Sequence, residues 1–180
     1  KFMKVAGPAF TVEVRPGDNL MIHAALLLAK PGDVIVVDGK GDLSCALTGE
    51  LMAAHAKQAG IAGFVIDGAV RDTEETARGD FPIFAAGANP NGPLKGAAGR
   101  INWPVSLAGT TVNPGDLIVG DADGVVVVPR ETAAEIVGAA QAKVDSETER
   151  MKAIGRGELA QSWVAESLKS VGVLGKDEKL

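Results

Sequence analysis

The stretch Ala62-Gly-Phe-Val-Ile-Asp-Gly-Ala-Val-Arg-Asp72 gives the strongest indication of how this chain folds. Its first half, residues 62–66, is a short apolar run rich in β-branched and aromatic side chains, which is typical of a buried strand. The run passes through Asp67-Gly68 to two adjacent charged residues, Arg71 and Asp72, so we expect a loop at the carboxyl end of the strand. In α/β folds, ligands bind where such loops meet helix N-termini. The stretch therefore predicts both a central strand and a candidate site.

The residues on either side predict further strands and helices of an α/β fold. We expect strands over residues 5–14, 34–37, 82–86, 101–107, 117–120 and 125–128, and helices over residues 19–29, 49–59, 131–154 and 158–169. Asp18 is the expected N-cap of the first helix, and Asp123-Gly124 the turn of the last hairpin, where Asp123 is a turn residue and not a metal ligand. Pro-Gly-Asp turns recur at irregular spacing and do not mark a repeat. With 180 residues and no linker, the chain is expected to form a single domain.

Composition and charge narrow the classes of function. A net charge of -5 without a run of Lys or Arg argues against a nucleic-acid partner. The single cysteine, Cys45, cannot form an internal disulfide, and His23 and His55 are expected to be ordinary packing or surface groups. No apolar run is long enough for a membrane span, and the first residues do not resemble a signal peptide. We therefore expect a cytoplasmic protein that binds small molecules or proteins, and, because the chain begins at Lys1, an additional N-terminal segment.

Arg71 and Asp72 combine two chemical groups that a 2-keto acid requires. An arginine fork holds a carboxylate with two hydrogen bonds, while an aspartate offers hard oxygen to Mg²⁺ or Mn²⁺. A structural interpretation is also open, because Asp72 and Glu75 match a capping box and Arg71 could simply be solvated.

A second candidate segment is Thr48-Gly-Glu-Leu-Met52, a glycine-containing entry into a predicted helix. The free backbone N–H groups of a helix N-terminus suit a carboxylate or phosphate. The alternative is that Gly49 only relieves backbone strain.

The long C-terminal helix carries Glu147 within an otherwise apolar stripe, whose other members are Ile136, Ala140, Val144, Met151 and Ile154. A carboxylate buried there needs a partner, a metal or water. Glu147 could instead lie at the solvated edge of the stripe. If the stripe packs on another subunit, Glu147 could reach the site of that subunit.

The segments Phe64–Asp72 and Gly49–Met52 together resemble the 4-hydroxy-4-methyl-2-oxoglutarate / 4-carboxy-4-hydroxy-2-oxoadipate aldolase family, to which the RraA-type regulators of RNase E are related. Residues 16–20, 31–34 and 157–159 extend the resemblance over most of the chain. It implies a swivelling α/β/β sandwich over residues 1–180, with the helices of residues 131–169 packed on the core or on a neighbouring subunit. It also implies a homotrimer or hexamer.

The same resemblance assigns roles to individual residues. Arg71 would bind the substrate carboxylate, and Asp72 would ligate Mg²⁺ or Mn²⁺ directly. The backbone amides that would hold the pyruvyl unit belong to Gly49, Glu50, Leu51 and Met52. Two further carboxylates would reach the metal through water, namely Glu50 and, from a neighbouring subunit, Glu147, with Glu149 as the second match.

The reaction that this resemblance implies is metal-dependent retro-aldol cleavage of 4-hydroxy-2-keto diacids to pyruvate and a second keto acid. Oxaloacetate decarboxylation is expected from the same site, because it passes through the same enolate. We expect groups from residues 87–99 or from a neighbouring chain to recognise the distal part of the acid. A Schiff-base aldolase would need a desolvated lysine, and the candidates Lys40 and Lys57 lie outside apolar patterns. The alternative from another class is a non-catalytic, protein-binding regulator of the RraA type.

Overall fold

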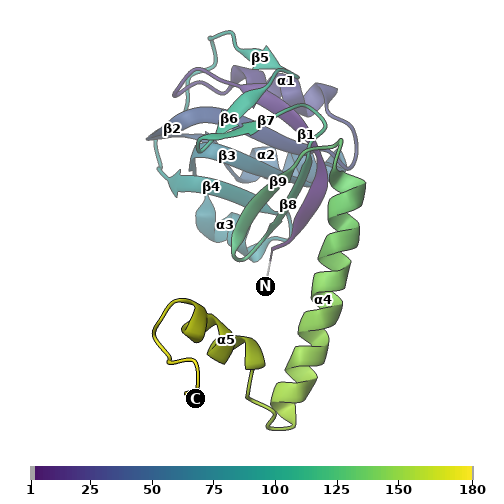
Figure 1. Cartoon of the computed structure of the whole chain (residues 1–180). Coiled ribbons are helices and arrows are strands. Elements are labelled where there is room, and N and C mark those ends of the chain that lie inside the picture. Colours follow the sequence, from purple (N-terminus) through teal and green to yellow (C-terminus); the bar gives the residue numbers. More distant parts are fainter. Residues whose placement is uncertain (1–2, 180) are drawn as a thin grey trace. The chain divides into compact units, whose positions relative to one another are not determined.

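The computed structural model describes residues 3–179. The chain forms two compact units, which meet between Ala133 and Ala134. The first unit mixes strands and helices, so the predicted α/β class is confirmed (Figure 1). Its elements in chain order are β1 (Val5–Glu13), α1 (Leu20–Leu28), β2 (Val34–Thr48), α2 (Glu50–Gln58), β3 (Gly63–Val70), α3 (Thr73–Arg78), β4 (Ile83–Ala88), β5 (Arg100–Ile101), β6 (Val105–Leu107), β7 (Thr110–Val112), β8 (Leu117–Asp121) and β9 (Gly124–Val128).

The main sheet has the strand order β4-β3-β2-β1-β8-β9, with β5 paired to β1 and a separate β6–β7 ribbon. Strands β1 to β4 run parallel, whereas β8 pairs antiparallel with β1 and forms a hairpin with β9. Parallel neighbours need crossover connections, and α1, α2 and α3 supply them. Because β1, β2 and β3 run in one direction, the loops that follow them meet at one edge of the sheet.

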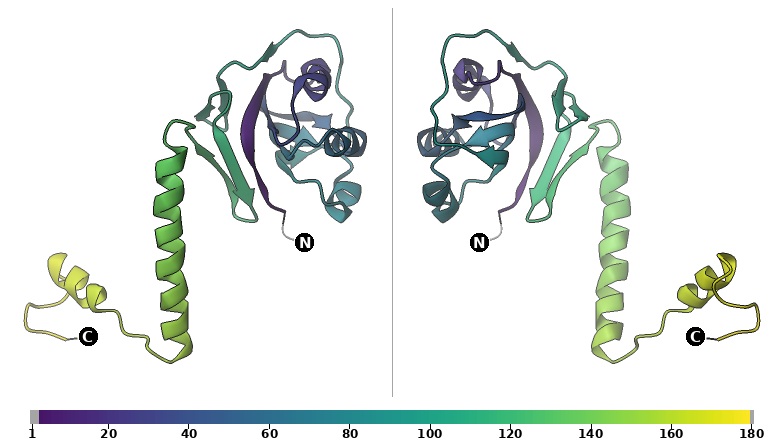
Figure 2. Two further views of the ribbon diagram at one scale, coloured as in Figure 1. Left: turned by 90° about the vertical axis from the view of Figure 1, so that its right-hand side faces the viewer. Right: turned by 90° about the vertical axis from the view of Figure 1, so that its left-hand side faces the viewer.

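Alternating side chains give the sheet a hydrophobic core on each face. Ile35, Val37 and Phe64 pack on one face with residues of α1 and α2, while Val34 and Val36 pack on the other with residues of β6, β7 and β8. This alternation follows from the period of two along a strand. Figure 2 shows the resulting layers of the first unit, with α1, α2 and α3 on one side of β1–β4 and the β6–β7 and β8–β9 pairs on the other.

The three Pro-Gly-Asp motifs form turns, as predicted. Their glycines, Gly17, Gly32 and Gly115, have φ values of 75°, 91° and 86°. This left-handed region disfavours residues with a Cβ, which explains why glycine occupies each turn. The predicted hairpin turn at Asp123-Gly124 is also confirmed, because Asp123 lies between β8 and β9.

Several predicted boundaries are wrong. Strand β2 continues to Thr48 through the glycine-rich stretch after Val37, with register shifts against β3. The strand expected over residues 101–107 is broken into β5 and β6 at Asn102, whose φ is 56°. An asparagine tolerates this left-handed conformation, which cannot continue a strand. The β7 strand was not predicted.

The second unit contains α4 (Ala133–Gly155) and α5 (Ser162–Ser170), so the last helix begins four positions later than the Glu158 expected from the sequence. No described residue of α4 is buried, and its apolar stripe includes Val144, Met151 and Ile154 with exposed fractions of 54%, 67% and 41%. No helix within residues 3–179 combines the length and apolar character needed to cross a bilayer.

Candidate active site

Two neighbouring strands of the sheet deliver the predicted site residues to the same place. Thr48, the last residue of β2, pairs with Val70, the last residue of β3. The backbone N–H of Arg71 donates to the Thr48 carbonyl at 3.0 Å. Gly49 at the start of α2 is thereby placed beside Arg71 and Asp72, although the two segments are more than twenty residues apart in the chain.

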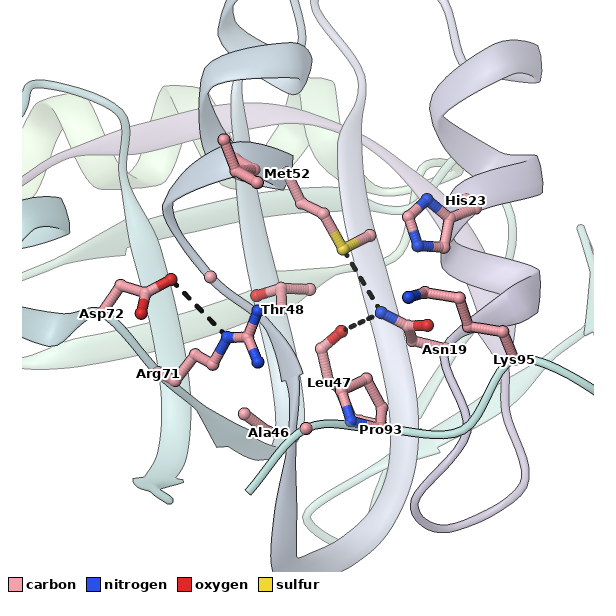
Figure 3. A pocket seen from close by; sticks show the side chains of 13 residues that line it. Asn19, His23, Ala46, Leu47, Thr48, Met52, Arg71, Asp72, Pro93 and Lys95 are labelled. Atoms are coloured by element: carbon pink, nitrogen blue, oxygen red, sulfur yellow. Dashed lines mark hydrogen bonds and ion pairs between the residues drawn. The ribbon is translucent and has the colours of Figure 1, made fainter. Parts of the chain in front are cut away.

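A cavity of about 220 Å³ lies at this edge of the sheet, and Arg71 and Asp72 both line it (Figure 3). The other lining residues are Asn19, His23, Ala46, Leu47, Thr48, Gly49, Leu51, Met52, Gly92, Pro93 and Lys95. The structure therefore brings together every predicted site residue of the segments 49–52 and 71–72 except one. The exception is the side chain of Glu50, which lines a different pocket beside Lys57 and Asp80.

The carboxylate of Asp72 joins the end of β3 to the start of α2. Its Oδ2 accepts a hydrogen bond from the backbone N–H of Glu50 at 3.0 Å. A Cβ on Gly49 would lie 2.3 Å from the same oxygen, so the close approach requires glycine. Within residues 3–179 no hydrogen bond reaches the other carboxylate oxygen, Oδ1, which is left for a ligand.

The capping-box interpretation of Asp72 is wrong as far as its side chain is concerned. Asp72 precedes α3 and has φ 55° and ψ 41°, but its side chain makes no cap hydrogen bond to that helix. The carboxylate instead satisfies an N-terminal N–H of α2, a helix whose free first-turn donors and dipole favour negative charge. Asp72 thus holds a strained conformation that aims its carboxylate across the site.

The guanidinium of Arg71 is available to a ligand. Its Nε lies 3.7 Å from Asp72 Oδ2, which is beyond ordinary hydrogen-bond distance, and its side chain is 43% exposed. Among the described residues, no other carboxylate approaches it within ion-pair distance. The planar fork is therefore free to take a carboxylate with two hydrogen bonds.

The opposite end of the cavity is formed by Asn19, His23 and Lys95, none of which the sequence indicated as a site residue (Figure 3). Asn19 immediately precedes α1 and His23 lies four residues on, so both occupy one face of the helix start. Lys95 comes from the loop after β4, within the stretch expected to recognise the distal part of a substrate. The sequence signal that could have identified Asn19 and His23 is a pair of polar residues four positions apart at the start of an otherwise apolar helix.

Three buried polar atoms of residues that line this cavity have no hydrogen-bond partner within the described chain. They are Asn19 Oδ1, His23 Nε2 and Thr48 Oγ1. Asn19 and Thr48 are each only 3% exposed. Unpaired buried polar atoms are rare because each costs about 1–3 kcal/mol. Their concentration around one cavity indicates a site built to receive a polar ligand.

His23 is held towards its neutral form. Burial lowers the pKa of His23 below its ordinary value, and the positive charges of Lys95 and His55 act in the same direction. The cavity therefore gathers a neutral imidazole, an ammonium and a guanidinium around one carboxylate, a balance that favours an anionic ligand.

Asp18 fixes the loop that carries Lys95 against the start of α1. Its Oδ2 accepts hydrogen bonds from the backbone N–H groups of Gly96 and Ala97 at 2.7 and 2.9 Å, while Oδ1 accepts from Leu20 N at 2.9 Å. These bonds lower the pKa of Asp18. The predicted N-cap position is therefore off by one, since Asn19 is the N-cap residue, but the Asp18 carboxylate does bind the first turn.

The remaining candidate residues lie outside this cavity. Glu147 and Glu149 are exposed on α4 and pair with Lys143 and Lys152 of the same helix, at 3.4 and 2.7 Å. Among the Schiff-base candidates, Lys57 pairs with Asp80, and Lys40 pairs with Asp38 at 2.6 Å and with Glu13 at 3.2 Å. The hydrogen bond that Lys40 donates to Asp38 raises the pKa of Lys40, which opposes the neutral amine that a Schiff base requires.

The donor set of the cavity is compatible with a hard divalent cation. No cluster of three or more His, Cys, Asp or Glu side chains able to hold a metal occurs within residues 3–179. Mg²⁺ nevertheless keeps several waters and is commonly held by one or two carboxylates together with its substrate. The free Oδ1 of Asp72, beside a guanidinium that can bind the substrate, meets this minimum.

Two curated relatives are similar to this chain in sequence. A curated relative from Halalkalibacterium halodurans, named "Putative 4-hydroxy-4-methyl-2-oxoglutarate aldolase", is 46% identical over 151 residues, covering 84% of this chain and 72% of its own. A Burkholderia mallei protein of the same name is 42% identical over 124 residues, covering 69% of this chain and 74% of its own.

A solved structure is similar to this chain in fold and in sequence. The RNA-processing inhibitor RraA from Thermus thermophilis superposes with a TM-score of 0.66 at 35% identity, covering 70% of this chain and 76% of its own. Residues 1–127 also match the model of the family described as RraA-like: Aldolase/RraA. The chain belongs to the RraA-like family.

Proposed function

We propose that this protein is a divalent-metal-dependent aldolase that cleaves 4-hydroxy-2-keto diacids to pyruvate and a second keto acid, and that it also decarboxylates oxaloacetate. The observation that carries this proposal is that Arg71 and Asp72 line one cavity together with three unpartnered buried polar atoms. The names of the aldolase relatives support the same reaction class.

Arg71 supplies substrate binding and orientation in this proposal. Its guanidinium takes the carboxylate next to the keto group, and Thr48 Oγ1, a buried hydroxyl of the cavity with no partner among residues 3–179, can donate to the same anion. The N–H groups of Leu51 and Met52, in the first turn of α2, have no acceptor within their own helix and can orient the pyruvyl oxygens. Fixing the acid at several points aligns the bond to be broken.

Retro-aldol cleavage breaks the C3–C4 bond while the C4 hydroxyl gives its proton to a water molecule, and the enolate that remains takes up a proton at C3 to give pyruvate. The rate therefore depends on stabilising the negative charge that develops at the keto oxygen. Asp72 Oδ1 would hold Mg²⁺ or Mn²⁺, which supplies Lewis-acid stabilisation of that charge. Arg71 and the N-terminus of α2 add fixed positive charge and dipole on the same side of the cavity.

Two carboxylates would complete the metal's surroundings through water. Glu50 is exposed and needs a different rotamer from the one that lines the neighbouring pocket. Glu147 would come from α4 of a neighbouring subunit within a homotrimer or hexamer. Its ion pair with Lys143 is exposed at both ends and would be easily exchanged for another partner.

The second candidate is a non-catalytic regulator, because the Thermus thermophilis neighbour is described as an RNA-processing inhibitor. The two candidates differ in one assay. Pyruvate release from 4-hydroxy-4-methyl-2-oxoglutarate is measured with Mg²⁺ and with EDTA, for the wild type and for Arg71→Ala. The aldolase predicts turnover that EDTA abolishes and that falls at least 100-fold in Arg71→Ala.

Absence of turnover in a wild type that is folded and metal-loaded would favour the regulator. Full activity in EDTA would contradict metal dependence and direct attention to a Schiff base on Lys95, the lysine that lines the cavity.

A further inference from the structure

The end of the cavity formed by Asn19, His23 and Lys95 carries hydrogen-bonding groups that the proposed chemistry at Arg71 and Asp72 does not use. In Figure 3 these three side chains lie on the far side of Thr48 from Asp72. Each belongs to the lining of the same cavity, so one elongated ligand can contact both ends.

Asn19 offers an acceptor and no donor to the cavity. Its Nδ2 donates to the Leu47 carbonyl at 2.9 Å and contacts Met52 Sδ at 3.4 Å, and both of these partners are acceptors. The amide orientation is therefore fixed, with Oδ1 left unpartnered in the described chain. With Asn19 only 3% exposed, this oxygen requires a ligand group that carries a hydrogen, such as a hydroxyl.

His23 and Lys95 offer donors beside this acceptor. His23 Nε2 is buried and unpartnered among residues 3–179, and a neutral imidazole protonated at this nitrogen donates from it. Lys95 makes no ion pair with any described residue, and its ammonium carries three donors. Asp72, at the other end, is the only carboxylate of a described residue in the lining. The charge at this end therefore suits an anion.

A hydroxyl and a carboxylate on the same carbon match this set of groups. We propose that Asn19, His23 and Lys95 form a specificity site for the hydroxy-carboxylate end of the substrate. The hydroxyl donates to Asn19 Oδ1, and the carboxylate accepts from His23 Nε2 and Lys95 Nζ. This inference rests on the proposed aldolase function and extends it, because it names the residues that select a 4-hydroxy diacid over other pyruvyl compounds.

The proposal predicts selection against acids that lack the hydroxyl. With 4-methyl-2-oxoglutarate bound, Asn19 Oδ1 would remain buried and unpaired. Such an acceptor weakens binding by at least roughly tenfold. This deoxy acid cannot undergo retro-aldol cleavage, so its inhibition constant can be compared directly with the affinity of the hydroxylated diacid.

Substitutions at His23 and Lys95 test the site without breaking contacts within the protein. Neither side chain makes a hydrogen bond or ion pair to any described residue, so His23→Leu and Lys95→Met are expected to fold, which circular dichroism checks. His23→Gln and Lys95→Arg restore a donor. The matched control is Lys30→Met, whose position lies outside the cavity lining.

Two ligands report on the two ends of the cavity in every variant. Pyruvate, used as a competitive inhibitor, engages only the Arg71 end, while 4-hydroxy-4-methyl-2-oxoglutarate engages both. We expect His23→Leu and Lys95→Met to raise KM for the diacid roughly tenfold or more while the inhibition constant of pyruvate changes by less than about twofold. In His23→Gln and Lys95→Arg, the KM for the diacid should rise less than in the Leu and Met variants.

Equal effects on pyruvate and the diacid would overturn the inference, because they would assign a general structural role to His23 and Lys95. An unchanged KM for the diacid in both variants would overturn it too, while wild-type turnover would leave the proposed aldolase function standing. A wild type that neither cleaves the diacid nor binds pyruvate would instead overturn the aldolase proposal, and this inference with it.

Discussion

The carboxylate of Asp72 accepts a hydrogen bond from the backbone N–H of Glu50 at 3.0 Å, and this bond ties the end of β3 to the first turn of α2. One oxygen of Asp72 is thereby used to fix the geometry, and the other remains free for a ligand. The dipole of α2 stabilises the carboxylate in its charged form. The contact depends on Gly49, whose missing side chain leaves room for Asp72 Oδ2.

Replacing Gly49 by alanine should disable the site without unfolding the protein. The new Cβ would lie 2.3 Å from Asp72 Oδ2 and 3.0 Å from Arg71 Cγ, so both side chains must move. A displacement of this size in a catalytic group typically lowers rates by about 100-fold. We expect kcat/KM for diacid cleavage to fall by that order, with the far-ultraviolet circular dichroism unchanged.

Gly138→Ala on α4 is the matched control, because a Cβ there meets no atom within 4 Å. It should retain full activity and slightly stabilise the helix. An active Gly49→Ala variant would mean that the position of Asp72 is not important for turnover.

Arg71→Lys should separate charge from geometry at the carboxylate-binding end. Lysine keeps the positive charge but cannot form two parallel hydrogen bonds to a carboxylate. We expect the inhibition constant of pyruvate to rise roughly tenfold or more, as measured by competition in steady-state assays. Arg78→Lys, in an exposed pair with Glu74, is the control and should bind pyruvate like the wild type. Pyruvate binding that tolerates lysine at position 71 would argue against the bidentate contact.

Asp18→Asn should loosen the loop that carries Lys95. The substitution turns the acceptor that binds the N–H groups of Gly96 and Ala97 into a group with donors of its own, so at least one of these bonds is lost. We expect a several-fold higher KM for the diacid, unchanged inhibition by pyruvate, and faster amide hydrogen exchange at residues 96–97. Asp123→Asn in the β8–β9 turn is the control, and unaltered exchange in Asp18→Asn would contradict the role of Asp18.

The lowered pKa of His23 should make stability depend on pH. The unfolded chain takes up the imidazole proton more readily than the folded protein, so the contribution of neutral His23 is fully present above the ordinary histidine pKa near 6.5 and is lost as pH falls towards the lower folded value. Between pH 7.5 and 5.5, wild-type Tm should therefore fall by a few degrees more than that of His23→Gln. If Tm changed with pH in the same way in the two proteins, burial of His23 would not oppose its protonation.

Local patterns in the sequence were sufficient to predict the strands and helices with regular periodicity. The apolar run 62–66, the helix at residues 49–59 and the Asp123-Gly124 hairpin are all present. The extension of β2 to Thr48 could not be predicted, because it depends on pairing with β3 through register shifts that no local rule encodes. The break at Asn102 likewise depends on a single left-handed residue.

Site residues that are adjacent in the sequence could be predicted together. Site residues that are distant in the sequence and are brought together only by the fold could not. Arg71 and Asp72 follow one strand and could be identified together. His23 and Lys95 lie in segments separated by most of the first unit, and the fold alone brings them to one cavity. A capping box on its own helix was one open interpretation of Asp72, but a long-range contact of its carboxylate to α2 determines its position.

The most direct measurement of the central claim is the affinity of pyruvate, by isothermal titration calorimetry, for wild type and Asp72→Asn in Mg²⁺ and in EDTA. If Arg71 and Asp72 serve one keto acid and one cation together, Mg²⁺ should strengthen pyruvate binding at least roughly tenfold in the wild type and have little effect in Asp72→Asn. Equal pyruvate affinity in Mg²⁺ and in EDTA, or the same Mg²⁺ dependence in both proteins, would contradict the claim.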